Sequence, residues 1–85
     1  MEKSQLVKNL KDLGWNCIIF NEKYALFRKQ HETYRWYLHQ VEINFVTKKC
    51  KFCMINPKSQ YFKDSTDHPQ IKQLIENYFK EVKND

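Results

Sequence analysis

Apolar residues recur at helical spacing in two stretches, one near each end of the chain. Over residues 4–13, four of them return every three or four positions and so share one helical face: Leu6, Val7, Leu10 and Leu13. Ser4 is a suitable N-cap, and Gly14 stands where helices commonly end in the left-handed conformation. The pattern therefore predicts a helix over residues 4–13.

The second helical pattern extends over three turns near the end of the chain. Six apolar residues share its buried face: Ile71, Leu74, Ile75, Tyr78, Phe79 and Val82. Asp67 followed three residues later by Gln70 has the form of a capping box, and Pro69 suits the first turn. We expect a second amphipathic helix here.

Runs of β-prone residues separated by short polar segments fill the middle of the chain. Residues 15–20 and 24–30 predict two strands joined by a turn at 21–23, and another turn follows at 31–33. This pattern is typical of an antiparallel meander.

The stretch 34–46 has 13 residues, which is long for one strand, because strands usually have about 5–6. Its apolar residues change phase between the two halves: Trp36 and Leu38, then Val41, Ile43 and Phe45. A strand shows each face every second residue, so we predict a β-bulge or bend near His39–Gln40, with Trp36 in the core. The outward set would then be Arg35, Tyr37, His39, Gln40, Glu42 and Asn44.

A fourth strand is predicted over residues 50–55, and Asn56–Pro57 ends it because proline cannot donate to a ladder. We expect one set of its side chains to face the core, namely Cys50, Phe52 and Met54. The outward set is then Lys49, Lys51 and Cys53, and the opposite phase stays open. The polar segment that follows is expected to be a loop, anchored on the core by Tyr61 and Phe62.

These elements predict one α+β domain over residues 1–85. It has two layers, in the order helix, three or four strands, helix. Both helices need to bury an apolar face, and the economical solution packs both on one face of an antiparallel sheet. The other face is then left to solvent or to a partner.

The order of elements resembles that of double-stranded RNA-binding domains. The opening is also similar to that of HicA-type toxins, which are small ribonucleases on that fold: Ser4-Gln5-Leu6-Val7-Lys8-Asn9-Leu10-Lys11-Asp12-Leu13-Gly14-Trp15. The resemblance to HicA-type toxins implies a catalytic histidine at the start of the second strand. The resemblance to RNA-binding domains implies a lysine cluster at the start of the last helix. Here those two places read Asn21-Glu22-Lys23-Tyr24 and Thr66-Asp67-His68-Pro69-Gln70. We assign no family.

Composition narrows the class of protein. Hydrophobic residues make up 41% of the chain, enough for a core, and no run approaches the roughly 20 apolar residues of a membrane span. The opening Met1–Ser4 is polar, unlike a signal peptide, and three cysteines argue against a disulfide framework. We expect a cytoplasmic domain that does not associate with membranes; its oligomeric state stays open.

The motif Cys50-Lys51-Phe52-Cys53 has the spacing of half a zinc site. Residues three apart on a strand point to opposite faces, so both sulfurs could not reach one ion, and no second pair of ligands has the right spacing. We predict no metal, no cofactor and no enzymatic activity.

Positive charge is concentrated in the predicted sheet. Residues 28–63 hold eight basic and two acidic residues, whereas the rest of the chain holds seven basic and eight acidic ones. Lysine and arginine neutralise phosphates, and exposed rings stack on unpaired bases. The leading hypothesis is a binding module for RNA or DNA that uses these residues: Arg28, Lys29, Tyr34, Arg35, Tyr37, His39, Lys48, Lys49 and Lys51.

Two other functions stay open. Tyr, Trp and Arg are also the preferred anchors of protein interfaces, so the chain could be a protein-binding inhibitor or adaptor, encoded by a phage or mobile element and acting on a host protein. The third hypothesis is a divergent HicA-like ribonuclease in which Arg35, Tyr37 and His39 form an acid–base cluster.

Overall fold

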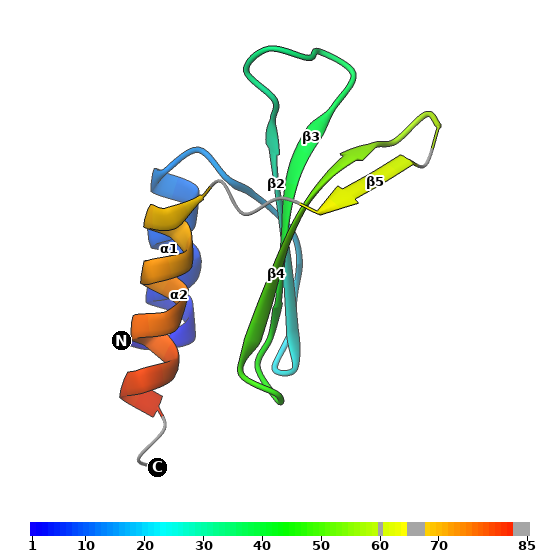
Figure 1. Ribbon diagram of the computed structural model, residues 1–85. Helices are drawn as coiled ribbons and strands as arrows, with labels where there is room; N and C mark the ends of the chain where they lie inside the picture. Colours follow the sequence, from blue (N-terminus) through cyan, green and yellow to red (C-terminus); the bar gives the residue numbers. More distant parts are fainter. Residues whose placement is uncertain (60, 65–67, 83–85) are drawn as a thin grey trace.

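The computed structural model describes residues 1–59, 61–64 and 68–82, the side chains of 61–64 excepted. It confirms the predicted α+β class: two helices lie side by side on one face of an antiparallel sheet (Figure 1). The sheet is a meander whose strands pair in chain order. The elements are α1 (Lys3–Asp12), β1 (Asn16–Phe20), β2 (Tyr24–Gln30), β3 (Leu38–Asn44), β4 (Lys49–Asn56), β5 (Tyr61–Asp64) and α2 (Pro69–Val82).

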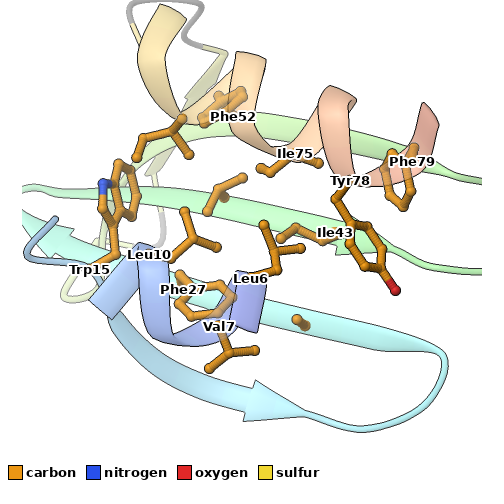
Figure 2. Close-up of a cluster of buried hydrophobic side chains, with 13 residues drawn as sticks. Leu6, Val7, Leu10, Trp15, Phe27, Ile43, Phe52, Ile75, Tyr78 and Phe79 are labelled. Carbon is orange, nitrogen blue, oxygen red and sulfur yellow. The ribbon is translucent and has the colours of Figure 1, made fainter. Parts of the chain in front are cut away.

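The core lies between the helices and the sheet, as Figure 2 shows. Leu6 and Leu10 of α1 and Ile75 of α2 are fully buried against Phe27 of β2 and Ile43 of β3. Burying a side chain of this size contributes about 1.5–3 kcal/mol. The helical spacing read from the sequence therefore identifies the buried faces of both helices.

Helix α1 begins one residue earlier than predicted. Its N-cap is Glu2, which makes no side-chain cap hydrogen bond, so the prediction of Ser4 as N-cap was wrong. The prediction for Gly14 is confirmed, because its φ is +92°, in the left-handed region that favours glycine. The last helix begins at Pro69 as expected, and the predicted cap Asp67 lies outside the described residues.

The predicted bulge in the third strand was wrong. Strand β3 begins only at Leu38 and pairs with both neighbours without a register shift, whereas the irregularity of this sheet lies in β1, between Cys17 and Ile19. Trp36, predicted in the core, lies before β3 and its side chain is 53% exposed. Without a slip, His39 shares the helix-covered face with Val41 and is buried, not outward-facing.

The predicted phase of the fourth strand is confirmed for its core side. Phe52 pairs with Val41 and is buried under the helices. Cys53 points to the other face, as predicted, yet it is also buried, with the amide Nε2 of Gln40 3.5 Å from its sulfur. The sheet face away from the helices therefore also carries buried side chains, at Gln40 and Cys53.

Residues predicted as a loop form an additional short strand. Backbone pairing joins Tyr61–Asp64 to Cys53–Asn56 of β4, so the sheet gains β5 at its edge. The predicted anchoring by the side chains of Tyr61 and Phe62 lies outside the described residues. The four-residue run is too short for an alternation pattern to identify it.

Three of the four hairpin connections begin with an asparagine that caps the turn. The side-chain oxygens of Asn21, Asn44 and Asn56 each accept hydrogen bonds from the backbone N–H groups two and three residues later, at 2.9–3.4 Å. Such Asx turns fix where each strand ends. The connection between β2 and β3 uses a different residue for the same purpose.

Candidate functional site

The nine residues predicted to bind nucleic acid fall in four places. By strand register, Arg28 and Lys51 lie on the sheet face away from the helices, and Lys29 and His39 on the helix-covered face. The others lie in connections at the two ends of β3: Tyr34, Arg35 and Tyr37 before it, and Lys48 and Lys49 after it. Seven residues of strand span about 20 Å, so the predicted set does not share one surface.

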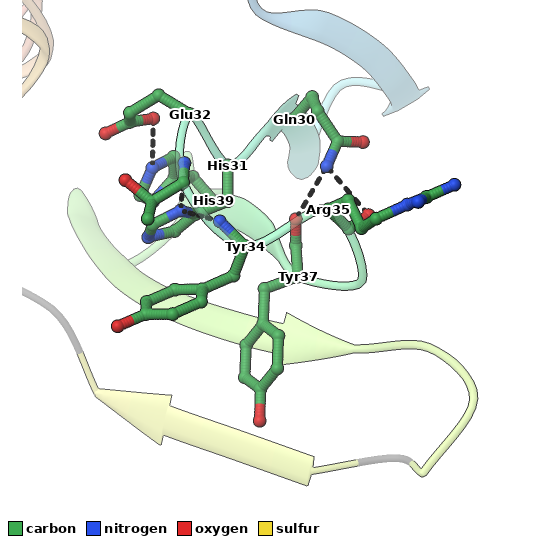
Figure 3. Close-up of polar contacts among 8 residues, drawn as sticks. Gln30, His31, Glu32, Tyr34, Arg35, Tyr37 and His39 are labelled. Carbon is green, nitrogen blue, oxygen red and sulfur yellow. Dashed lines mark hydrogen bonds and ion pairs between the residues drawn. The ribbon is translucent and has the colours of Figure 1, made fainter.

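The connection before β3 consists of residues 31–37, here called the β2–β3 loop. His31 opens it, and its ring nitrogen Nδ1 accepts hydrogen bonds from the backbone N–H groups of Thr33 and Tyr34, each at 3.0 Å (Figure 3). This is the geometry of the asparagine caps, with an imidazole in place of an amide. Because Nδ1 accepts two hydrogen bonds, the proton of the neutral ring lies on Nε2.

Gln30, the last residue of β2, holds the far side of the loop. Its side-chain amide donates to the carbonyl oxygens of Arg35 and Tyr37 at 3.0 and 3.2 Å (Figure 3). The backbone N–H of His31 also donates to the Tyr37 carbonyl at 3.1 Å, which closes the base of the loop. The loop therefore has a defined conformation set by the two side chains at the end of β2.

This loop presents exposed rings and cations together. The side chains of Tyr34 and Trp36 are 59% and 53% exposed. The Arg35 guanidinium lies 5.1 Å from the Trp36 ring centroid, and Nζ of Lys58, from the β4–β5 turn, lies 4.0 Å from it. Both distances are those of cation–π contacts. We call this surface the aromatic end, comprising Tyr34, Arg35, Trp36, Tyr37 and Lys58.

Two residues of the aromatic end were missed by sequence reasoning. Trp36 was assigned to the core because it continued an apolar alternation, and Lys58 was left out because a loop was expected around it. The available signal was Pro57, which ends β4 and starts a turn able to bring Lys58 back over the loop.

Three histidines that are far apart in the sequence meet at the base of the same loop. The rings of His31 and His39 stack with centroids 4.6 Å apart, and His68, just before α2, meets His39 edge-on at 4.6 Å. Trp15 contacts His68 at 5.2 Å. Sequence reasoning did not predict this cluster, because the contacts depend on strand register and on how α2 packs.

A carboxylate completes the cluster. Glu32 Oε2 lies 3.0 Å from His39 Nε2, and this hydrogen bond lowers the pKa of Glu32 below its usual value. Glu32 is largely exposed, whereas the side chain of His39 is only 9% exposed. One atom each from His31, Glu32 and His39 lies within 4.8 Å of the other two, which is close enough for a shared ion.

The lysines after β3 line a different feature at the opposite end of the sheet. Lys48, Lys49 and Lys72 border a shallow cleft of about 250 Å³ between the β3–β4 turn and α2, together with Glu76. Lys48 has a φ of +59°, a conformation that a residue with a side chain adopts at some cost. The acidic Glu76 reduces the positive charge there.

The two cysteines of the Cys-x-x-Cys motif point to opposite faces of the sheet, as their spacing predicts. Cys50 pairs with Ile43 on the helix side, and Cys53 pairs with Gln40 on the other side. Burial raises the pKa of the Cys50 thiol, which disfavours the thiolate that metal binding and redox exchange need.

No protein-family model matches this chain, and neither a curated protein nor a solved structure is similar enough to count as a match. Within the described residues, neither helix has the length and apolar character needed to cross a membrane. The geometry of the α+β domain itself is therefore the basis for inferring a function.

Proposed function

We propose that this protein is a non-enzymatic binding module that takes single-stranded RNA or DNA at its aromatic end. The observation that carries the proposal is the exposed ring of Trp36 with two cations beside it, Arg35 and Lys58. Base–aromatic stacking contributes about 1–3 kcal/mol per base, and every base has a face for it. The cations would neutralise the phosphates on either side of a stacked base.

The surroundings favour an anionic, flexible partner. Glu32 is the only acidic residue of the β2–β3 loop, and its carboxylate is engaged by His39. Gln30 and His31 hold the loop backbone in place, which reduces the entropy lost on binding. The bases of a duplex are already stacked and cannot stack on Trp36, so single strands are the expected ligand.

Two matched double variants test the location of the site. Arg35→Gln/Lys58→Gln and Lys48→Gln/Lys49→Gln each remove two positive charges, one pair at each end of β3. The ends are about 20 Å apart, roughly two Debye lengths at 0.1 M salt, so the second pair should contribute little there. Fluorescence anisotropy with a labelled oligonucleotide measures both affinities.

The first pair should weaken binding and lower the salt dependence of log K by about 1.4, which is 0.7 for each phosphate that is no longer neutralised. The second pair should leave the affinity within about twofold at 0.1 M salt. Equal losses of affinity for the two pairs would show that binding is not localised at the aromatic end. Absence of binding to any single-stranded probe at low salt would exclude the function.

A protein partner is the second candidate, and strand β1 favours it. Ile18, Ile19 and Phe20 are 43–50% exposed in succession, on a strand that pairs only with β2 among the described residues. Exposed apolar edge strands are typical sites for an added strand from another chain. Capture of one host protein after nuclease treatment, lost with Ile19→Lys and retained with Trp36→Ala, would support this function over the first.

A further inference from the structure

His31 is the exception among the four residues that cap the hairpin turns. Asn21, Asn44 and Asn56 perform the same capping with an amide oxygen. An asparagine would accept the same two backbone N–H groups here, so capping alone does not require a histidine. The imidazole differs in stacking on the ring of His39 and in offering a ring nitrogen within 4.8 Å of ligand atoms of Glu32 and His39.

The spacing of the neighbouring atoms suits a small cation. Glu32 Oε2 and His39 Nε2 are 3.0 Å apart, and two ligands of a tetrahedral Zn²⁺ are about 3.3 Å apart at bond lengths near 2.0–2.1 Å. The ligand atom of His31 lies within 4.8 Å of both. A shift of about 1.5 Å would therefore bring all three onto one ion.

The cluster is both ordered and accessible. His39 is held by ring contacts with His31 and His68, and its Nδ1 is buried with no hydrogen-bond partner among the described residues. The carboxylate of Glu32 is 71% exposed and gives an ion a path from solvent. Because the imidazole is already held in place, binding an ion costs little conformational entropy of this side chain. The exposed carboxylate can then complete the site.

We propose that His31, Glu32 and His39 bind a divalent transition-metal ion of the Zn²⁺ type, through two imidazole nitrogens and one carboxylate oxygen. Imidazole suits Zn²⁺, Ni²⁺, Cu²⁺ and Co²⁺, whereas Mg²⁺ and Ca²⁺ prefer sites made of oxygen atoms alone. The fourth position of a tetrahedral ion is left to water. The site shares no side chain with the aromatic end, but the two are coupled, because His31 also caps the loop that carries Trp36. A metal titration needs no nucleic acid, so it tests the site separately from the proposed function.

Metal binding would compete with the cap of the turn. A neutral imidazole has a single lone pair, and that of His31 accepts the N–H groups of Thr33 and Tyr34. An ion at Nδ1 displaces both groups, and an ion at Nε2 moves the ring proton to Nδ1, where it faces them. The two hydrogen bonds of the cap contribute about 1–2 kcal/mol together. We expect coordination of the ion by three side chains to outweigh this loss.

A cobalt titration of the untagged full chain tests the site. Co²⁺ should bind with one-to-one stoichiometry and give visible d–d bands without a thiolate charge-transfer band, since the cysteines take no part. Zn²⁺ should displace it. The backbone amide resonances of Thr33 and Tyr34 should shift when Zn²⁺ binds, because these two N–H groups lose their hydrogen-bond acceptor.

Three variants separate coordination from folding. His31→Asn retains the turn cap but lacks the ring, and Glu32→Gln removes the carboxylate charge; each should weaken Co²⁺ binding by about tenfold or more. Glu22→Gln, an exposed carboxylate in another turn, should bind like the unchanged chain. A thiolate band, no saturable binding, or unchanged affinity in both His31→Asn and Glu32→Gln would overturn the proposal.

Discussion

A single side chain at the start of each hairpin connection sets where the strands end in this sheet. Three of the four are asparagine, and the fourth is His31, whose ring nitrogen accepts the same pair of backbone N–H groups. The sequence predicted the turn at Asn21 and the strand end at Asn56–Pro57, but it placed Asn44 inside the third strand. The equivalence of His31 could not be predicted, because imidazole acts as an Asx-like acceptor only in one tautomer and rotamer.

Replacing His31 tests its structural role separately from any ligand. His31→Ala removes one acceptor for two N–H groups and should lower the free energy of unfolding by about 1–2 kcal/mol. His31→Asn should retain the value within about 0.5 kcal/mol, because an amide oxygen caps the three other turns. Urea denaturation of the metal-free protein measures both. Equal losses would mean that the ring stacking on His39, and not the cap, supplies the stability.

At the level of elements, regular periodicity was the reliable guide. Both helices were predicted with their buried faces, since α1 and α2 each carry an uninterrupted helical pattern, and β2 was predicted with its bounds. Strand β3 was overextended because Trp36 mimics an inward position while lying in a loop. The β5 strand was missed because pairing with β4, rather than any local pattern, defines it.

Two aromatic truncations test the corrected assignment of the core. Phe27 is fully buried in the core, so Phe27→Ala should lower the free energy of unfolding by about 3–5 kcal/mol. Trp36 is half exposed, so Trp36→Ala should change the free energy of unfolding by no more than about 0.5 kcal/mol. Chemical denaturation followed by circular dichroism gives both values. A large loss of stability for Trp36→Ala would show that this ring contributes to the packed core.

For the molecule as a whole, the net charge of residues 28–63 does not tell where the individual cations lie. The net positive charge in residues 28–63 was correctly placed in the sheet and its connections. The sheet nevertheless divides those cations between two ends and two faces, because alternate residues of a strand point in opposite directions. Sequence alone could not separate Lys48 and Lys49 from Arg35, since their distance depends on the hairpin geometry.

Two tryptophans in contrasting environments make the proposed stacking of bases on Trp36 measurable by fluorescence. Trp15 is 2% exposed and Trp36 is 53% exposed, so quenching by an added ligand reports mainly on Trp36. A single-stranded oligonucleotide added at low salt should quench this fluorescence by stacking on the indole, and added salt should restore it. Trp36→Phe should abolish the signal while a labelled oligonucleotide still binds. Binding without quenching, or no binding at low salt, would contradict the proposed function.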